Sequence, residues 1–91
     1  MSKIKGVITN MSEVIQVGQY KKLYVRVKEN EGEYPQSGYF EVFGDTKVDN
    51  VLKYNQVGDV VELEYNLKDN ESKKEEGFFY NTLQAWKITK V

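Results

Sequence analysis

Residues 39–63, YFEVFGDTKVDNVLKYNQVGDVVEL, form the stretch that decides the fold. Its first residues, Tyr39 to Phe43, are the aromatic and β-branched types that favour a pleated strand. Gly44 can end this strand because glycine takes a positive φ without strain, and Asp45 is a good N-cap for a helix. The stretch therefore begins with a strand that passes directly into a helix.

A short helix and a further strand are expected after this junction. Val48, Val51 and Leu52 stand at positions i, i+3 and i+4, which gives the helix one narrow apolar stripe. A helix of about two or three turns is too short to be stable in water unless it packs on another element. Asn55 can close the helix in the left-handed conformation, and the turn at residues 57–59 leads into the next strand.

Two strands are expected before residue 30. Residues 2–17 are rich in β-branched types and have an irregular middle, which fits a long strand with a central bulge or a strand broken in two. Residues 20–29 show the most regular alternation of apolar and polar side chains in the chain. The residues of this strand that are expected to face the core are Leu23, Val25 and Val27.

Two further strands are expected after the helix. The first of them has an alternating inward set, made up of Val61, Leu63, Tyr65 and Leu67. Residues 69–77, DNESKKEEG, carry no apolar side chain and predict a solvated loop. The last strand, residues 78–91, has apolar side chains of both parities, so that a bulge and a two-sided strand are both open.

One helix between the third and the fourth of five strands is the pattern of an OB-fold barrel. The 91 residues leave room for one domain. We therefore predict an all-β fold: a five-stranded OB-fold Greek-key barrel over residues 1–91, with one short α-helix between strands three and four.

Two absences limit the chemistry of the chain. It has no cysteine and no histidine, which removes thiolate chemistry, the commonest metal ligand and the commonest general base. Carboxylates cluster at residues 29–33 and 69–76, but neither cluster has the spacing of a calcium-binding loop. We therefore expect no enzymatic activity, no catalytic residues, no bound metal and no cofactor.

No segment of the sequence predicts a membrane span or export. No apolar run approaches the roughly 18 residues that cross a bilayer. The N-terminal residues MSKIKG lack the apolar core of a signal peptide. We expect a cytoplasmic protein without a membrane partner.

The net charge and the aromatic content indicate different partners. The net charge is −1, so the charge of the whole chain does not indicate a nucleic-acid-binding protein. Seven Tyr, four Phe and one Trp, however, are more rings than the interior of a small barrel easily holds. Some of these rings must face outward, and exposed rings call for an explanation.

The outward face of residues 20–29 is the most informative set of candidate binding residues. Its members are Tyr20, Lys22, Tyr24, Arg26 and Lys28. Rings offer flat surfaces for bases, and cations between them neutralise phosphates, which is what a platform for single-stranded nucleic acid needs. A plain solvated strand face, which often mixes Lys and Tyr, is the alternative interpretation.

Three further residues extend this candidate site. Tyr39 and Phe43 continue the ring face on the next strand, although Phe43 can also belong to the core. Lys74 can clamp a nucleic-acid strand, because the loop between the last two strands of an OB barrel overhangs its binding face; a plain hairpin is the alternative. Trp86 fits the core or a subunit contact better than a stacking ring.

The order of these elements resembles that of the OB-fold single-stranded DNA-binding proteins of bacteria and phages. The resemblance rests on Gly6, on Phe43-Gly44, and on the motifs at residues 57–59 and 77–80. The chain is most similar to a family of short single-barrel proteins of unassigned function. The members of this family share a Phe-Glu-x-Phe-Gly element, which stands here at residues 40–44, and an Ala-Trp-Lys near the end, which stands here at residues 85–87.

This resemblance implies base stacking on the second and third strands, by Tyr24, Tyr39 and Phe43. We therefore expect a largely sequence-independent single-stranded DNA-binding protein that protects strands exposed in replication or recombination, in a cell or in a phage infection. By analogy with related barrels we also expect a homo-oligomer, a dimer or a tetramer, and no small-molecule substrate. The alternative is an OB-fold protein–protein interaction module whose ring-rich face holds another protein.

Overall fold

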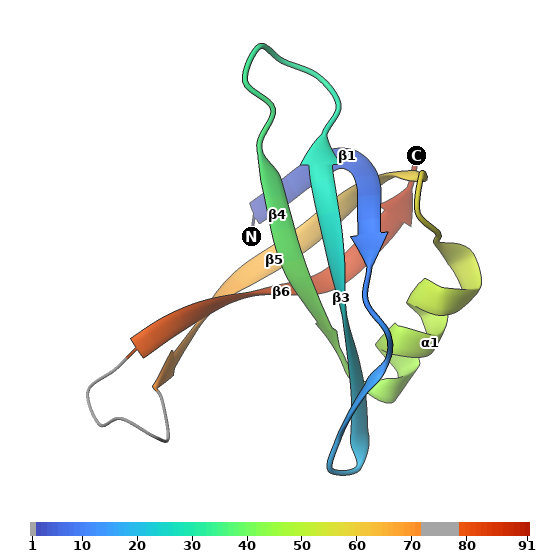
Figure 1. Cartoon of the computed structure of the whole chain (residues 1–91), viewed down its shortest axis with the longest axis vertical. Helices are drawn as coiled ribbons and strands as arrows, with labels where there is room; N and C mark the ends of the chain where they lie inside the picture. Colours follow the sequence, from blue (N-terminus) through green and yellow to red (C-terminus); the bar gives the residue numbers. More distant parts are fainter. Residues whose placement is uncertain (1, 72–78) are drawn as a thin grey trace.

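Residues 2–71 and 79–91 are described by the computed structural model of the chain, which contains six strands and one helix (Figure 1). The elements, in chain order, are β1 (Ser2–Met11), β2 (Ile15–Val17), β3 (Tyr20–Glu29), β4 (Ser37–Phe43), α1 (Asp45–Tyr54), β5 (Val60–Glu71) and β6 (Phe79–Lys90).

The strands close into a barrel through β1. The sheet has the order β1-β5-β6-β4-β3-β2, and β1 also pairs with β3, which closes a ring of five strands. β4 and β6 pair in parallel through Glu41 and Gln84, whereas the other pairings are antiparallel. With β2 as the continuation of β1 and α1 between the third and fourth strands of the ring, the OB-fold prediction is confirmed.

Both alternatives for the first strand occur in the structure. The pairing of β1 with β3 shifts between Ile8 and Asn10, so that Thr9 is an extra residue in a bulge. The strand then breaks after Met11, before the three-residue β2. The bulge and the break let one stretch of chain pair first with β5 and then with β3.

Gly6 lies where β1 crosses from β5 to β3. A Cβ atom at this position would overlap the carbonyl oxygen of Lys28 on β3, which is backbone and cannot turn aside. We expect Gly6→Ala to lower the free energy of unfolding by about 1–3 kcal/mol or more, as overpacking does. Chemical denaturation measures this free energy, and Lys5→Ala, an exposed neighbour on the same strand, is the control. An unchanged midpoint for Gly6→Ala would contradict the close approach of β1 and β3.

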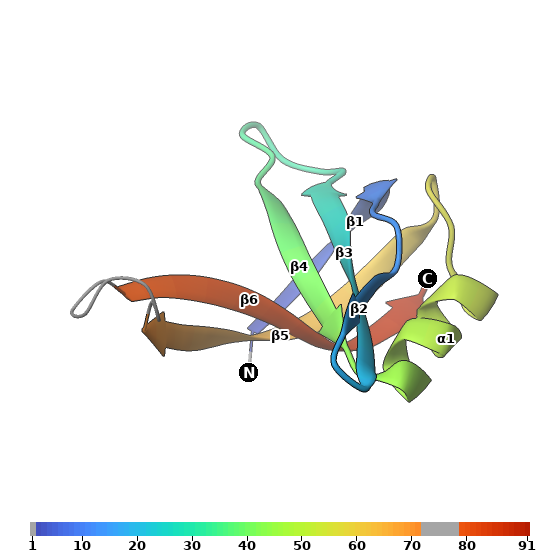
Figure 2. The same cartoon turned by 60° about the horizontal axis from the view of Figure 1, so that its bottom comes forward.

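The core lies inside the ring and is closed at one end by α1. Its side chains are at most 5% exposed: Ile8, Leu23, Val25, Val27, Phe40, Val42, Val48, Val51, Val61, Leu63 and Ala85. The three residues predicted to face inward on β3 are all fully buried, so that assignment of faces is confirmed. Figure 2 shows α1 beside one end of the barrel, where it contributes two valines to this core.

The ends and the stripe of α1 differ from the prediction. Gly44, with φ of 108°, is the N-cap, and Asp45 lies inside the helix, where its Oδ1 accepts a hydrogen bond from the Lys21 backbone N–H at 2.8 Å. Asn55 is extended (φ −129°), so the predicted left-handed closure is wrong. Leu52 is 50% exposed, because only Val48 and Val51 of the predicted stripe reach the barrel.

The β5–β6 hairpin explains two differences in the second half of the chain. β5 runs on to Glu71, so residues 69–71 belong to a strand and not to the predicted loop. Beyond Tyr65, β5 has no partner in β1, and the two strands leave the barrel as a ribbon on the side away from α1 (Figures 1 and 2). Leu67 lies in this ribbon and is 65% exposed, so its predicted inward position is wrong.

A bulge in β6 settles the inward set of the last strand. Glu64 pairs with Lys87 and Tyr65 with Ala85, so that Trp86 is the extra residue. Leu83 and Ala85 face the core before the bulge, and Ile88 does so after it, although their sequence parities differ. Trp86 itself is 42% exposed.

Candidate nucleic-acid interface

The candidate interface is the outer surface of β3 and β4. The two strands pair from Lys22 opposite Phe43 to Lys28 opposite Ser37. Since side chains alternate between the two faces of a strand, the buried valines and leucine of β3 force the residues between them outward. The structure thus brings together, on one face, all the predicted site residues of β3 and β4: Tyr20, Lys22, Tyr24, Arg26, Lys28, Tyr39 and Phe43.

Tyr24 and Tyr39 form a stacked pair at the centre of this face. Tyr24 lies opposite Glu41, so that Tyr39, two residues earlier on β4, is its diagonal neighbour. The ring centroids are 5.0 Å apart and the ring planes differ by 9°. Tyr39 is 53% exposed. The pair therefore offers an ordered, flat aromatic surface to solvent.

Tyr20 and Phe43 form a second pair at the end of β4 nearest α1. Their centroids are 5.7 Å apart with the planes tilted by 39°, and the two rings are 55% and 39% exposed. They line a shallow hollow of about 350 Å³ together with the first turn of α1. The exposure of Phe43 excludes its interpretation as a core residue.

The cations of β3 differ in how freely they can meet a phosphate. The Nζ atom of Lys22 lies 5.5 Å from the centre of the Tyr24 ring, and Lys28 is exposed. Arg26 is held in place because its guanidinium donates to Thr9 Oγ1 at 2.9 Å and to Ser37 Oγ at 3.3 Å. A fixed guanidinium keeps further N–H donors for a phosphate, whereas the lysines supply mobile charge.

One carboxylate lies among these groups. Glu41 accepts a hydrogen bond from Tyr24 OH at 3.5 Å and from Gln84 Nε2 at 3.3 Å. Each of its two carboxylate oxygens therefore already accepts a hydrogen bond from a neighbouring side chain. A single hydrogen-bonded carboxylate leaves the rings accessible to a ligand, but it lowers the positive electrostatic potential around them.

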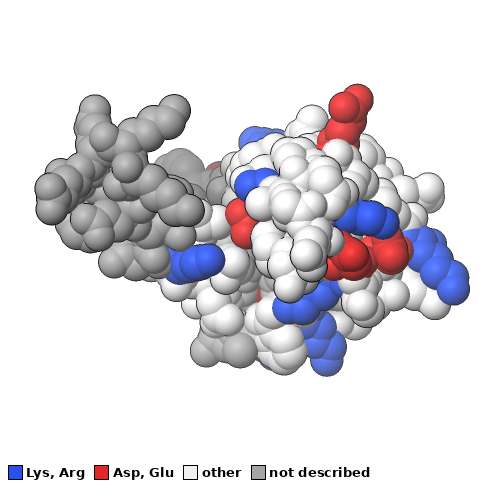
Figure 3. Space-filling model, turned by 90° about the horizontal axis from the view of Figure 1, so that it is seen from below, with Lys and Arg blue, Asp and Glu red and all other residues white. Residues whose placement is uncertain are grey.

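Charges of both signs also alternate at the end of the molecule that carries α1 and the β2–β3 turn (Figure 3). This distribution agrees with the net charge of −1 and leaves no large field of one sign there. Any nucleic acid would therefore be held by short-range contacts with rings and individual cations, and long-range steering would be weak.

Two predicted features need separate mention. Lys74 lies outside the described residues. Trp86 is too exposed for the core position that the sequence favoured, because the β6 bulge turns it outward. The outward position of Trp86 had a signal in the sequence. Leu83 and Ile88 both pack against the core although one position is odd and the other even, and a strand with one inward face allows this only if it contains a bulge.

The described ranges show no sign of a metal centre or of a membrane span. Among the described side chains, those of residues 2–68 and 82–91, there is no group of three or more carboxylates placed to hold a metal ion. The helix of these ranges, α1, is 10 residues long and falls well short of the length that crosses a membrane.

Comparison with known proteins identifies both a family and a fold. The model of the family described as "Domain of unknown function (DUF3127)" matches residues 3–89. A comparison with curated protein sequences yields no match. Two crystal structures of Rim1, the mitochondrial single-stranded DNA-binding protein of S. cerevisiae, are similar to the chain: the first with a TM-score of 0.73 and 16% identity, the second, of selenomethionine-labelled protein, with 0.66 and 17%. Each similarity covers 99% of this chain and 92% of the Rim1 chain.

These similarities bear on the family expected from the sequence. The similarity to Rim1 shows that the chain has the fold of an OB-fold single-stranded DNA-binding protein. The expected link to bacteria and phages stays a prediction.

Proposed function

The chain belongs to the DUF3127 family, and because the description of that family assigns no activity, we propose the function from the geometry of the β3–β4 face. We propose that this face binds single-stranded DNA with little sequence preference. The similarity of the fold to a protein named for single-stranded DNA binding supports the proposal.

The observation that carries the proposal is the exposed stack of Tyr24 on Tyr39. Exposed aromatic rings mark interaction sites, and bases are flat partners that stack on them. Stacking of one base on one ring contributes about 1–3 kcal/mol. Because every base has a flat face, a platform built on stacking tolerates any sequence.

The role of the cations is to meet the phosphates between the stacked bases. Lys22 lies over Tyr24, Arg26 lies opposite Tyr39, and Lys28 continues the row along β3. Lys74, which stands between β5 and β6 in the sequence, is proposed as a further phosphate contact. In this proposal the protein is a binding protein and not an enzyme, and it uses no cofactor.

The proposed cellular role follows from the ligand. A protein that covers single strands without regard to sequence would protect strands exposed in replication or recombination, in the cytoplasm. Self-association into a dimer or tetramer belongs to the same proposal, by analogy with other barrels of this fold.

Titration of labelled oligo-dT, followed by fluorescence anisotropy at several salt concentrations, tests the proposal. Four phosphate contacts predict a slope of log K against log [salt] of about −3, since each contact on a single strand contributes about −0.7. Affinity should therefore fall about 50-fold between roughly 50 and 200 mM salt. The absence of binding at low salt and micromolar protein would overturn the proposal.

The alternative, a protein-interaction module, is favoured by two observations. Glu41 lies within the ring face, and the net charge is −1, so the surface is less cationic than is usual for a nucleic-acid platform. A module of this kind predicts weak, salt-insensitive retention of oligo-dT. The same salt series therefore separates the two functions.

A further inference from the structure

A second concave surface lies between α1 and β6. It is a groove of about 630 Å³ whose floor is formed by the apolar side chains Val42, Val51, Ala85 and Ile88. Its rim carries polar and aromatic side chains from both elements, namely Lys47, Asn50 and Tyr54 of α1 and Trp86, Lys87 and Lys90 of β6. None of these residues is among those expected to bind DNA from the sequence.

The charge of the groove is of one sign. Its lining contains three lysines and no carboxylate. Lys90 lies 3.6 Å from Asp59, which lowers its net contribution. Lys47 and Lys87 form no ion pair with the side chains of residues 2–68 and 82–91, which are those that the structure describes. This groove is therefore suited to a ligand that carries negative charge and has apolar or flat parts.

Two exposed rings border the same groove. Trp86 is 42% exposed because the β6 bulge turns it away from the core. Tyr54, in the last turn of α1, is 60% exposed. Exposed rings beside lysines are the same combination that the β3–β4 face presents, but the lining of this groove contains no carboxylate.

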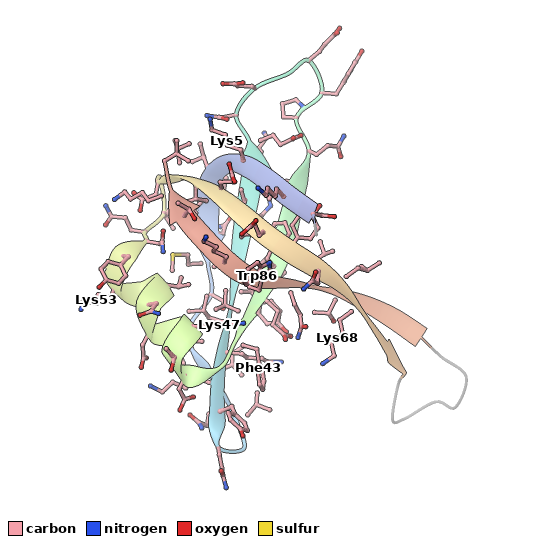
Figure 4. The ribbon with its side chains drawn as sticks, turned by 180° about the vertical axis from the view of Figure 1, so that it is seen from behind. Lys5, Phe43, Lys47, Lys53, Lys68 and Trp86 are labelled. Atoms are coloured by element: carbon pink, nitrogen blue, oxygen red, sulfur yellow. The ribbon has the colours of Figure 1, made fainter. Side chains whose placement is uncertain are left out.

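The groove is continuous with the β3–β4 face. Glu41 and Gln84 are joined by a side-chain hydrogen bond across the parallel β4–β6 pair. Phe43, two residues after Glu41, and Trp86, which follows the buried Ala85, are both exposed, so both rings lie on the outer surface beside this contact. Lys47 lines both the hollow beside Phe43 and the groove beside Trp86. Figure 4 shows Phe43, Lys47 and Trp86 gathered near the junction of β4, β6 and α1.

We propose that a single strand bound on the β3–β4 face continues past Phe43 into the α1–β6 groove. Trp86 and Tyr54 stack on its bases there, and Lys47 and Lys87 neutralise its phosphates. This inference rests on the proposed function and extends it. It gives the path of the bound strand over the surface, and it extends the binding site beyond the four rings of the β3–β4 face. Continuity with the ring face favours DNA over an acidic peptide as the occupant.

The single tryptophan of the chain makes the groove directly observable. Trp86 is the source of the tryptophan emission, so quenching of that emission reports on the groove, while the anisotropy of a labelled oligonucleotide reports on binding anywhere. Oligo-dT of about 5 and about 15 nucleotides brackets the site sizes of OB folds. The longer oligonucleotide is expected to quench Trp86, and the shorter one to bind with less quenching.

The variant that tests the groove combines Lys47→Ala with Lys87→Ala. Its charge-matched control combines Lys3→Ala with Lys5→Ala, which removes two exposed lysines of β1 that do not line the groove. Each phosphate contact contributes about fivefold to affinity near 0.1 M salt. The groove variant should bind the longer oligonucleotide about 5- to 25-fold more weakly and with a shallower salt slope, and the control should not. Both variants should bind the shorter oligonucleotide equally.

Three outcomes would count against the inference. If the longer oligonucleotide binds without quenching Trp86, or if the groove variant behaves like its control, the groove is not part of the path and the proposed function stands. If a poly-glutamate peptide quenches Trp86 and oligo-dT does not, the groove belongs to an acidic peptide. If neither oligonucleotide binds at all, the proposed function and this inference both fail.

Discussion

Replacing Tyr24 and Tyr39 together with alanine is expected to weaken the binding of oligo-dT by at least about 30-fold. Each ring provides about 1–3 kcal/mol of base stacking, and the double variant removes both rings of the stacked pair. Because both rings lie outside the core, the free energy of unfolding should fall only by the contribution of one aromatic pair, which is about 0.5–1.5 kcal/mol. Anisotropy titration and chemical denaturation measure the two quantities.

Two controls sharpen this prediction. Tyr24→Phe with Tyr39→Phe keeps the flat rings and removes the hydroxyl groups, so it should retain most of the affinity if stacking is the source of binding. Tyr34→Ala removes a ring that is 79% exposed in the loop between β3 and β4, away from the platform, and should bind like the unaltered protein. Normal affinity in the double alanine variant would remove the ring pair from the binding site.

Phe40→Ala is expected to show the opposite pattern, a large loss of stability with little loss of intrinsic affinity. Phe40 is 1% exposed, its ring centroid lies 4.9 Å from that of Tyr65, and the ring fills the space that a side chain at Gly38 would need. Emptying such a site costs about 3–5 kcal/mol. The midpoint of thermal unfolding should fall by about 12 °C or more.

The neighbouring residue provides the control for Phe40. Tyr39→Ala removes a ring of similar size one position away, on the other face of β4. The account predicts that position 40 governs stability and position 39 governs affinity. Equal destabilisation by the two substitutions would mean that the inner and outer faces of β4 have been assigned wrongly.

Much of the fold could be predicted because local patterns and tertiary structure agree. The alternation in β3 separates Leu23, Val25 and Val27 from the outward residues without ambiguity, and the structure buries all three. The β4–α1 junction is predicted by Gly44, whose φ of 108° few other residues adopt. These features depend on neighbours along the chain, which a sequence displays directly.

The features that could not be predicted depend on pairing between distant strands. The bulges at Thr9 and Trp86 each shift the parity of a strand by one, which moves every following side chain to the other face. Leu67 has a regular inward parity, yet it is exposed because β5 has already passed the end of β1. The point at which β5 leaves the barrel depends on where its pairing with β1 ends, which the sequence of β5 alone does not display.

The candidate site shows the same division. The outward rings and cations of β3 could be predicted from alternation, whereas the diagonal pairing of Tyr24 with Tyr39 needs the register of β3 on β4. The hydrogen bond from Gln84 to Glu41 needs the parallel contact between β4 and β6, because the two residues are 43 positions apart in the chain. The α1–β6 groove likewise combines distant residues, and no motif in the sequence marks it.

The central claim is that the rings on the outer face of β3 and β4 bind single-stranded DNA, and NMR of the ring protons tests it most directly. On addition of oligo-dT, the ring signals of Tyr24, Tyr39 and Phe43 should shift upfield, since stacked bases shield them, and those of Tyr34 should stay in place. Bound oligo-dT that leaves the signals of Tyr24, Tyr39 and Phe43 unchanged would contradict the account.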